Sequence, residues 1–408
     1  MITTIDYDQV SNILKPYISH IKEHEEGEFL VRSLIKMLEE MPREERNMLR
    51  DHMEDYLSKM DQYDASDIDL GGRGCVGKIW YRIHGIKKPI ETSPTYTKLE
   101  TNMLILNLVN PNQWEYLIEH KSLDLSYVLS SDVEKRYRAT IYFDMNHIAM
   151  NMRKINSEIR PFRGLKLHPE VAKYLSLKYL KYGLTLVTGI TGSGKSTTLD
   201  TIIDANNRSV QGHIVVISSP IELVHDPKKC IIRHREVGRD VGSFREGIVQ
   251  AMRQDPDIVV IGELRDDVAI MNALEVTDSG HKVFSTLHTA SAMESIDRII
   301  GEVEIHEQER VRVRLADVLT CVISQKLVQT LDGKRVLAKE VLIGTPPVRA
   351  AIRNNNVAEI YQMLNEGSKF GMNTLEQDLK RLVDERKISN EEAINQANNI
   401  DRMKQLLK

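Results

Sequence analysis

The sequence predicts an α/β protein whose central part is a mostly parallel β-sheet, and two observations favour this fold class. Between about residue 169 and residue 345, short apolar segments alternate with segments of helical character, as they do where helices connect parallel strands. The first apolar segment is followed at once by a glycine-rich loop and then by a helical run. We expect the strands at residues 184–187, 214–217, 258–261 and 283–285.

The regions before this central part differ from it in composition. Residues 1–60 are strongly charged and predict helices, because apolar residues recur there at helical spacing. These residues are Leu30, Val31, Leu34, Ile35 and Leu38. The extension is either a docking appendage or a solvated helical cap on the next domain. Residues 61–160 predict a small α+β domain, in which β-branched and aromatic runs at 79–83 and 139–143 flank a helical stretch at 97–108.

The remaining boundaries follow from local signals. Residues 161–168 contain a proline and a glycine and predict a linker, so the central domain is expected at 169–345. Residues 346–408 predict a C-terminal helical region. Within it, Asn373 stands three residues before Glu376, which is the spacing of a capping box at the start of a helix.

Composition excludes several classes of protein. The 408 residues carry a formal net charge of −4, and aromatic residues make up only 5%, so we expect no nucleic-acid partner. The three cysteines, Cys75, Cys230 and Cys321, are widely spaced and predict reduced, buried thiols rather than disulfides or a zinc site. The sequence shows no export signal and no apolar stretch of membrane-spanning length. We therefore expect a cytoplasmic protein that reaches a membrane only through partners.

The glycine-rich loop predicts a phosphate-binding site. Residues 189–196 read Gly-Ile-Thr-Gly-Ser-Gly-Lys-Ser, which satisfies the pattern G-x-x-x-x-G-K-[ST]. Gly192 and Gly194 allow the backbone to curl so that its N–H groups surround a phosphate, and the following helix directs its positive end to the same charge. Lys195 is expected to reach the β- and γ-phosphates of ATP, and Ser196 to ligate Mg²⁺. The predicted nucleotide-binding residues are Gly189, Ile190, Thr191, Gly192, Ser193, Gly194, Lys195, Ser196 and Thr197.

Acidic residues follow two of the predicted strands. Glu263 lies just past the strand at 258–261, at the edge where α/β sheets place their ligands. A carboxylate there can orient or deprotonate an attacking water. Glu222 follows the strand at 214–217 and is predicted to be a second catalytic carboxylate. His281 and His288 lie before and after the strand at 283–285; a structural role is the alternative for each.

Several of these segments together resemble one family, the ATPases of type II secretion and type IV pilus systems. Residues 254–266 resemble that family's Walker B segment, residues 235–238 its upstream loop, and residues 280–289 its histidine box. Residues 65–69 resemble the opening of its N-terminal domain. The resemblance implies a RecA-like P-loop core with a smaller, PAS-like N-terminal domain. It also implies ATP and Mg²⁺ as ligands, a homo-hexamer, and a platform protein in the inner membrane as partner.

The resemblance also implies roles for single residues. Glu263 would be the catalytic base or would bind Mg²⁺ through water. His281 and His288 would sense the γ-phosphate or couple subunits. Arg138 and Arg153 would supply positive charge at the γ-phosphate, as Arg265 would in a coupling role, although a surface salt bridge is the alternative for any single arginine.

The sequence departs from the family in its acidic box. The family usually has Glu-Asp before Pro-Ile-Glu, whereas this chain has Ser218 and Ser219 before residues 220–222. Hydroxyl groups still form hydrogen bonds but carry no charge, so the departure bears on the rate of turnover more than on nucleotide binding. Asp278 also stands where the family commonly has Glu.

The resemblance favours one branch of the family. Extension and export ATPases commonly carry a four-cysteine zinc knuckle, and the region after Leu327 contains no cysteine. Residues 370–379 resemble the branch that retracts pili. The sequence therefore predicts a motor for type IV pilus retraction and twitching motility. The alternatives are a pilus-assembly or type II export ATPase, and a weakly hydrolysing nucleotide switch.

Overall fold

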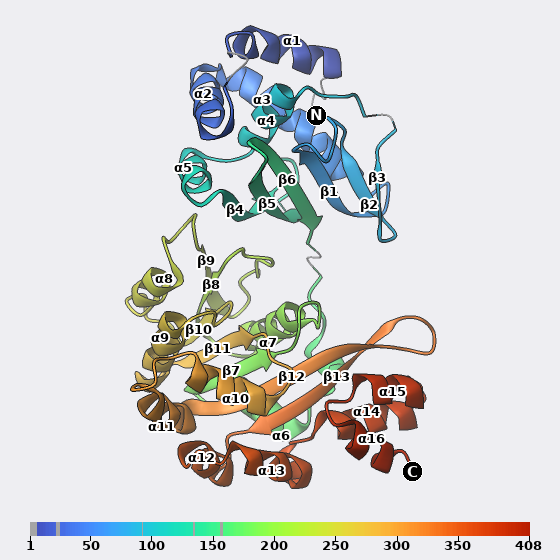
Figure 1. The fold of residues 1–408 in the computed structure, drawn as a ribbon. Helices are drawn as coiled ribbons and strands as arrows, with labels where there is room; N and C mark the ends of the chain where they lie inside the picture. Colours follow the sequence, from blue (N-terminus) through green and yellow to red (C-terminus); the bar gives the residue numbers. More distant parts are fainter. Residues whose placement is uncertain (1–5, 22–24, 92, 134, 156–157) are drawn as a thin grey trace. The chain divides into compact units, whose positions relative to one another are not determined.

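The chain folds into two compact units. The computed structural model describes residues 6–21, 25–91, 93–133, 135–155 and 158–408 (Figure 1). The first unit comprises Met1–Ser157 together with Ser219–Leu223, and the second comprises Glu158–Ser218 and Val224–Lys408. The first five residues, which contribute to the expectation about an export signal, lie outside the described residues.

The first unit combines helices with a six-stranded antiparallel sheet. Its helices are α1 (Tyr7–Ile18), α2 (Gly27–Glu40), α3 (Arg43–Lys59), α4 (Lys98–Leu106) and α5 (Pro111–His120). Its strands are β1 (Ala65–Gly71), β2 (Trp80–Ile83), β3 (Ile86–Pro89), β4 (Ser122–Val128), β5 (Arg136–Asp144) and β6 (His147–Lys154). The strand order is β3-β2-β1-β6-β5-β4.

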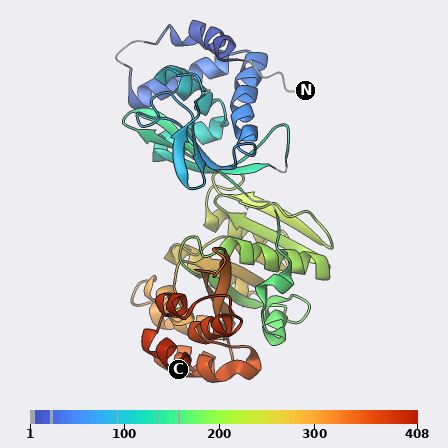
Figure 2. The ribbon, with the colours of Figure 1, turned by 90° about the vertical axis from the view of Figure 1, so that its right-hand side faces the viewer.

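The helices of this unit cover one face of its sheet. Helix α4 packs on β1 and β6, α5 packs on β4, and α1 and α2 pack on α4; Figure 2 shows the blue N-terminal helices beside the strands. All five apolar residues predicted for the stripe of the N-terminal extension are buried in this core. Within the described residues, the extension therefore packs as a helical cap.

The second unit contains a seven-stranded sheet and eleven α-helices among its described residues. Its strands are β7 (Gly183–Thr188), β8 (Gly212–Ser218), β9 (Cys230–Glu236), β10 (Ile258–Ile261), β11 (Lys282–Leu287), β12 (Leu319–Gln329) and β13 (Arg335–Ile343). Its helices are α6 (Pro169–Leu175), α7 (Lys195–Ser209), α8 (Phe244–Ala251), α9 (Asp267–Asp278), α10 (Ala292–Gly301), α11 (Gln308–Val318), α12 (Pro346–Arg353), α13 (Ile360–Glu366), α14 (Leu375–Asp384), α15 (Asn390–Gln396) and α16 (Ile400–Leu406).

The order of the strands explains where the ligand-binding edge lies. The order is β13-β12-β7-β11-β10-β8-β9, and every neighbouring pair is parallel except β12 with β13. The prediction of a mostly parallel α/β sheet is confirmed. Since β7, β11, β10 and β8 are parallel neighbours, the loops that follow them gather at one edge of the sheet.

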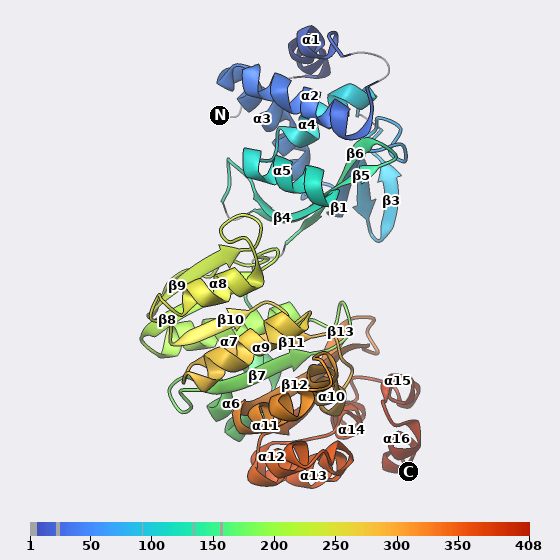
Figure 3. The ribbon, with the colours of Figure 1, turned by 60° about the vertical axis from the view of Figure 1, so that its left-hand side comes forward.

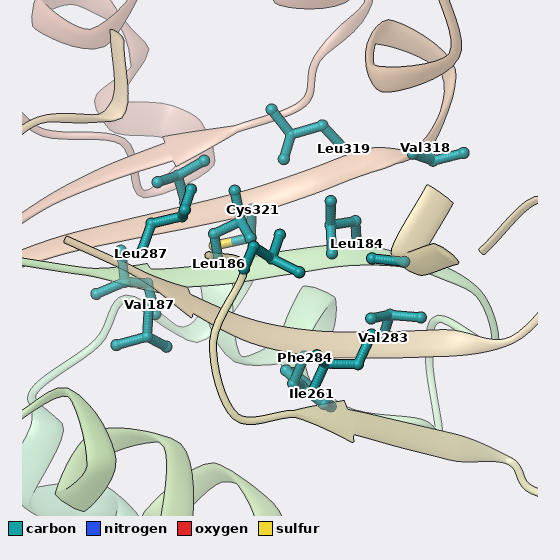
Figure 4. Packing of buried hydrophobic residues seen from close by; sticks show 14 of the residues in the cluster. Leu184, Leu186, Val187, Ile261, Val283, Phe284, Leu287, Val318, Leu319 and Cys321 are labelled. Carbon is teal, nitrogen blue, oxygen red and sulfur yellow. The ribbon is translucent and has the colours of Figure 1, made fainter. Parts of the chain in front are cut away.

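Apolar side chains from these strands form the main core. The central strands β7 and β10 are buried along their whole length, as expected for a parallel sheet covered on both faces. Figure 4 shows Leu186, Val187, Phe284, Leu287 and Cys321 among the buried residues of this core. Helix α7 packs on β7, β9 and β11, and helices α8 to α11 pack side by side in Figure 3.

The C-terminal helices form a smaller core with the outer half of the β12–β13 hairpin. Val328 and Ala338 of the hairpin are fully buried against apolar residues of α14, α15 and α16. The predicted helix start at Asn373 is wrong by one residue. Thr374 is the N-cap of α14 and forms the capping box with Gln377, because Asn373 instead donates its side-chain N–H to Lys339 O at 2.7 Å.

The segment predicted as a linker has structure of its own. Residues 162–165 form a short 3-10 helix, and Leu165 is buried in the core of the second unit. The boundary between the two units falls before it, between Ser157 and Glu158. Among the residues that the structure describes, no helix combines the length and the apolar character that a membrane crossing requires.

Candidate functional site

The glycine-rich loop connects the central strand β7 to helix α7. Gly192 and Gly194 have φ angles of 80° and 87°, which a residue with a Cβ atom adopts only with strain. A Cβ atom added at Gly192 would meet nothing within 4 Å, so the loop is open at this point. The backbone is therefore curled around open space at the N-terminus of a helix, which is the arrangement that binds phosphate.

Lys195 lies over this loop. Its Nζ atom donates hydrogen bonds to Gly189 O at 2.9 Å and to Ile190 O at 3.2 Å. The next residue, Ser196, is exposed in the first turn of α7. An ammonium group and an open hydroxyl group therefore lie where the sequence predicts contacts with a triphosphate and with Mg²⁺.

Strand order brings Glu263 and His288 to the same place. Glu263 follows β10 and His288 follows β11, and β11 lies between β10 and the strand that leads into the loop. His288 Nε2 lies 3.8 Å from Glu263 Oε2, and its Nδ1 lies 3.5 Å from both Lys195 Nζ and Thr191 Oγ1. The imidazole of His288 thus lies between the phosphate loop and Glu263, the predicted catalytic base.

The electrostatics of this group favour a neutral imidazole. Burial lowers the pKa of His288, and the charge of Lys195 lowers it further, while Glu263 acts in the opposite direction. Arg265 forms an ion pair with Glu263, whose side chain is 19% exposed. The carboxylate is therefore held between a guanidinium and an imidazole at the edge of the sheet.

His281 does not join this group. It precedes β11, whereas His288 follows it, so the length of a strand of six residues, roughly 20 Å, separates them. The ring of His281 pairs with Ser279 Oγ at 2.9 Å. This placement separates His281 from the phosphate loop of the same chain. The roles predicted for His281 stay proposals, and a structural role stays the alternative.

Glu222 and Arg138 pair with each other. Glu222 lies in the segment 219–223, which groups with the first unit, and its Oε1 lies 3.3 Å from Arg138 Nη1. Both side chains are more than one-third exposed. The catalytic roles predicted for these two residues remain proposals.

Arg153 lies beside Arg138 because of strand register. The two arginines are direct cross-strand partners on β6 and β5, on the face of the sheet that the helices leave open. Arg153 Nε donates to Asp67 Oδ1 at 2.8 Å, and Arg82 lies 3.6 Å from the other oxygen of Asp67. The buried carboxylate of Asp67 thus gives Arg153 a structural partner, and the role predicted for Arg153 at the γ-phosphate stays a proposal.

The altered acidic box lies at the same edge as Glu263. A Cβ atom added at Gly262 would approach Ser218 Oγ to 2.6 Å, so the serine side chain lies against the backbone just before Glu263. A hydroxyl group therefore occupies a place at which the family usually has a carboxylate.

Sequence reasoning missed Gln325, which contacts the loop from β12. Its Nε2 donates to Ser193 O at 2.7 Å. The signal was the polar pair Ser324 and Gln325, which is followed by Lys326 and stands between apolar residues of the strand. Only the pairing of β12 with β7 shows that this pair lies beneath the loop.

The residues present fit a nucleotide with Mg²⁺. The open curl at Gly192 offers backbone N–H groups, and Lys195 and Ser196 offer a cation and a metal-binding hydroxyl. Within the described ranges, no three His, Cys, Asp or Glu side chains form a group that would hold a metal by themselves.

A parallel sheet with such a loop after a central strand, and with a carboxylate beside it, defines a P-loop ATP hydrolase. The family described as "Type II/IV secretion system protein" matches residues 43–406, and the chain belongs to this family. It is therefore an ATPase of the secretion and pilus motor class.

Individual relatives point in the same direction. The chain is 39% identical over 312 residues to the type IV pilus retraction ATPase PilT of Pseudomonas aeruginosa, covering 76% of this chain and 89% of that protein. It is 36% identical to a twitching motility protein of Neisseria gonorrhoeae, covering 79% and 85%. A crystal structure of the pilus retraction motor PilT with bound ADP matches with a TM-score of 0.76 at 32% identity, covering 86% of this chain and 98% of that one.

Proposed function

We propose that this ATPase powers the retraction of type IV pili. The observation that carries the proposal is the gathering of Lys195, His288 and Glu263 at one sheet edge, in a chain whose relatives include a pilus retraction ATPase and a twitching motility protein. The motor would work as a homo-hexamer in the cytoplasm. It would meet the inner membrane through a pilus platform protein.

The proposed chemistry divides among a few residues. The backbone of 189–196 and the ammonium group of Lys195 would hold the phosphates, and the hydroxyl group of Ser196 would help to hold Mg²⁺. Bound Mg²⁺ neutralises negative charge on the phosphates. Glu263 would orient or deprotonate the attacking water, and neutral His288 would connect that carboxylate to the loop.

The hydrolysis step has a direct test. Steady-state phosphate release should be measured on a sized oligomer, with the wild type beside Lys195→Ala and Glu263→Gln. Each variant should lose at least about 100-fold in kcat. Glu275→Gln, which changes an exposed glutamate of α9 in the same way, should keep wild-type turnover. Full activity in Glu263→Gln would show that another group activates the water.

The arginines of the first unit need a separate comparison. If Arg138 and Arg153 act on the γ-phosphate, then Arg138→Gln and Arg153→Gln should lower kcat while ADP affinity stays unchanged. Arg82→Gln is the matched control, because Arg82 lies near the same buried Asp67. Equal loss of thermal stability in the Arg82 and Arg153 variants, with turnover intact, would leave Arg153 a purely structural role.

Retraction itself is tested in the cell. Deletion of the gene should leave excess pili that do not retract. Absence of surface pili after deletion would instead support an extension or export motor, the first alternative.

The acidic box supports a second candidate, a nucleotide switch with little turnover. Ser218 lies against Gly262, beside the predicted base, without a carboxylate's charge. Under this alternative, the sized oligomer would bind ATP tightly and release little phosphate. Turnover that Ser218→Asp increases would show that the serine limits the rate of a working motor.

A further inference from the structure

Gln325 lies where strand β12 passes under the phosphate loop. Its neighbour Ser324 pairs in register with Thr188, the last residue of β7, so Gln325 is level with the first residues of the loop. The side chain is 1% exposed. It therefore faces the loop from within the protein, on the side away from solvent.

Two loop glycines lie close to this residue. A Cβ atom added at Gly189 would come within 2.5 Å of Gln325 O, and one added at Gly194 would come within 3.3 Å of Gln325 Nε2. Gln325 is therefore close to the backbone at both ends of the loop. Between these ends, Gln325 Nε2 donates to Ser193 O at 2.7 Å.

This single hydrogen bond sets the orientation of a peptide plane. A trans peptide is planar, so its C=O and N–H groups point in opposite directions. With Ser193 O directed at Gln325, the N–H group of Gly194 is directed away from β12, towards the inside of the loop. We propose that Gln325 is a positioning residue for nucleotide binding, which holds the Gly194 N–H group ready to donate to a phosphate. This inference rests on the proposed use of the loop for nucleotide.

The surroundings of Gln325 argue for such a role over simple packing. Its Oε1 atom is buried and has no hydrogen-bond partner among the residues described, and the same holds for Ser193 Oγ. A buried polar atom without a partner is costly. An apolar side chain of similar length would fill this space without that cost, but it would not direct the Ser193 carbonyl.

The test compares nucleotides that differ in phosphate number. Gln325→Met keeps the length of the side chain and removes the donor, and Gln325→Glu replaces the donor with an acceptor. Both variants, as full-length oligomers, should bind ADP about tenfold more weakly. Affinity for AMP, which lacks the β-phosphate, should stay within about twofold. KM for ATP should rise while kcat changes little, because the Gly194 N–H contact is made in the ground state and in the transition state alike.

Thr320→Val is the matched control on the same strand. Thr320 Oγ1 donates to Leu184 O at 2.8 Å and pairs with Thr185, so this variant also loses a buried hydrogen bond, but one away from the loop. It should lower the melting temperature and leave ADP affinity unchanged. If Gln325→Met binds ADP like the wild type, or loses AMP and ADP affinity equally, the inference is overturned.

Lys195→Ala separates this inference from the proposed function. Loss of ADP binding in Lys195→Ala, with normal binding in Gln325→Met, would overturn only the role of Gln325. Normal ADP binding in Lys195→Ala would instead overturn the assignment of the loop itself.

Discussion

Replacement of the buried Lys282 should remove a defined part of the protein's pH-dependent stability. Lys282 is the first residue of β11 and is fully buried. Its Nζ donates to Tyr174 O at 2.6 Å and lies 5.4 Å from the centre of the Phe284 ring. Burial lowers the pKa of Lys282 from 10.5 to about 8, and Cys321 opposes this slightly. The folded protein therefore releases this proton at a lower pH than the unfolded chain.

The sign and size of the effect follow from proton linkage. Between pH 8 and 10.5 the unfolded chain still holds the proton that the folded protein has lost, so this group makes the folded state more stable as pH rises. At about 1.4 kcal/mol for each pH unit, the gain across this window approaches about 3 kcal/mol. Below pH 8 the side chain of Lys282 is charged in both the folded and the unfolded chain, so the free-energy cost of burying this charge is fully present.

Lys282→Met should therefore lack this gain. The assay is urea unfolding of the wild type and the variant at pH 7 and at pH 10, at one protein concentration. The wild type should gain about 2 to 3 kcal/mol relative to Lys282→Met between these pH values. Lys181→Met, at an exposed lysine, should follow the wild type. A constant difference between wild type and Lys282→Met at both pH values would show that the buried amine does not titrate in this window.

Three further predictions concern other parts of the second unit. Because burial and Lys195 lower the pKa of His288, the imidazole is neutral at pH 7; ATPase activity should fall only on acidification below pH 6.5, and His288→Asn should show no such acid limb in a pH–rate profile. Leu186→Ala empties a fully buried site in the central strand and should cost about 2 to 5 kcal/mol in urea unfolding, whereas a cost under about 1 kcal/mol would mean that the core closes around the gap. Thr374→Ala removes the N-cap of α14 and its reciprocal bond with Gln377 and should cost about 1 kcal/mol, visible as a lower melting temperature; an unchanged melting temperature would contradict the cap.

The sequence predicted those features that depend on residues close together in the chain. The spacing of Gly192, Gly194 and Lys195 identifies a phosphate loop, because the loop and the strand and helix on either side of it are continuous in sequence. The position of Glu263 after a short apolar strand was also enough to predict that it lies at the ligand-binding edge, since the carboxyl ends of neighbouring parallel strands meet at one edge. Strand order then places His288 beside Glu263.

Features that depend on pairing between distant segments could not be predicted. The contact of Gln325 with the loop requires the pairing of β12 with β7, and a strand's partner is not visible in its own residues. The juxtaposition of Arg138 and Arg153 depends on the register of β5 and β6, in which a shift of one residue would turn either side chain to the other face. The histidine box led sequence reasoning to treat His281 and His288 alike, whereas the length of β11 separates them.

The β12–β13 hairpin takes part in two cores at once. Near its start, Val322 and Ile323 pack in the main core, and further along, Val328 packs with the C-terminal helices. Gln325 lies between these two attachments. The C-terminal helices therefore hold in place the strand that contacts the phosphate loop. A chain cut after residue 373 would lose rigidity at its nucleotide site as well as its last helices.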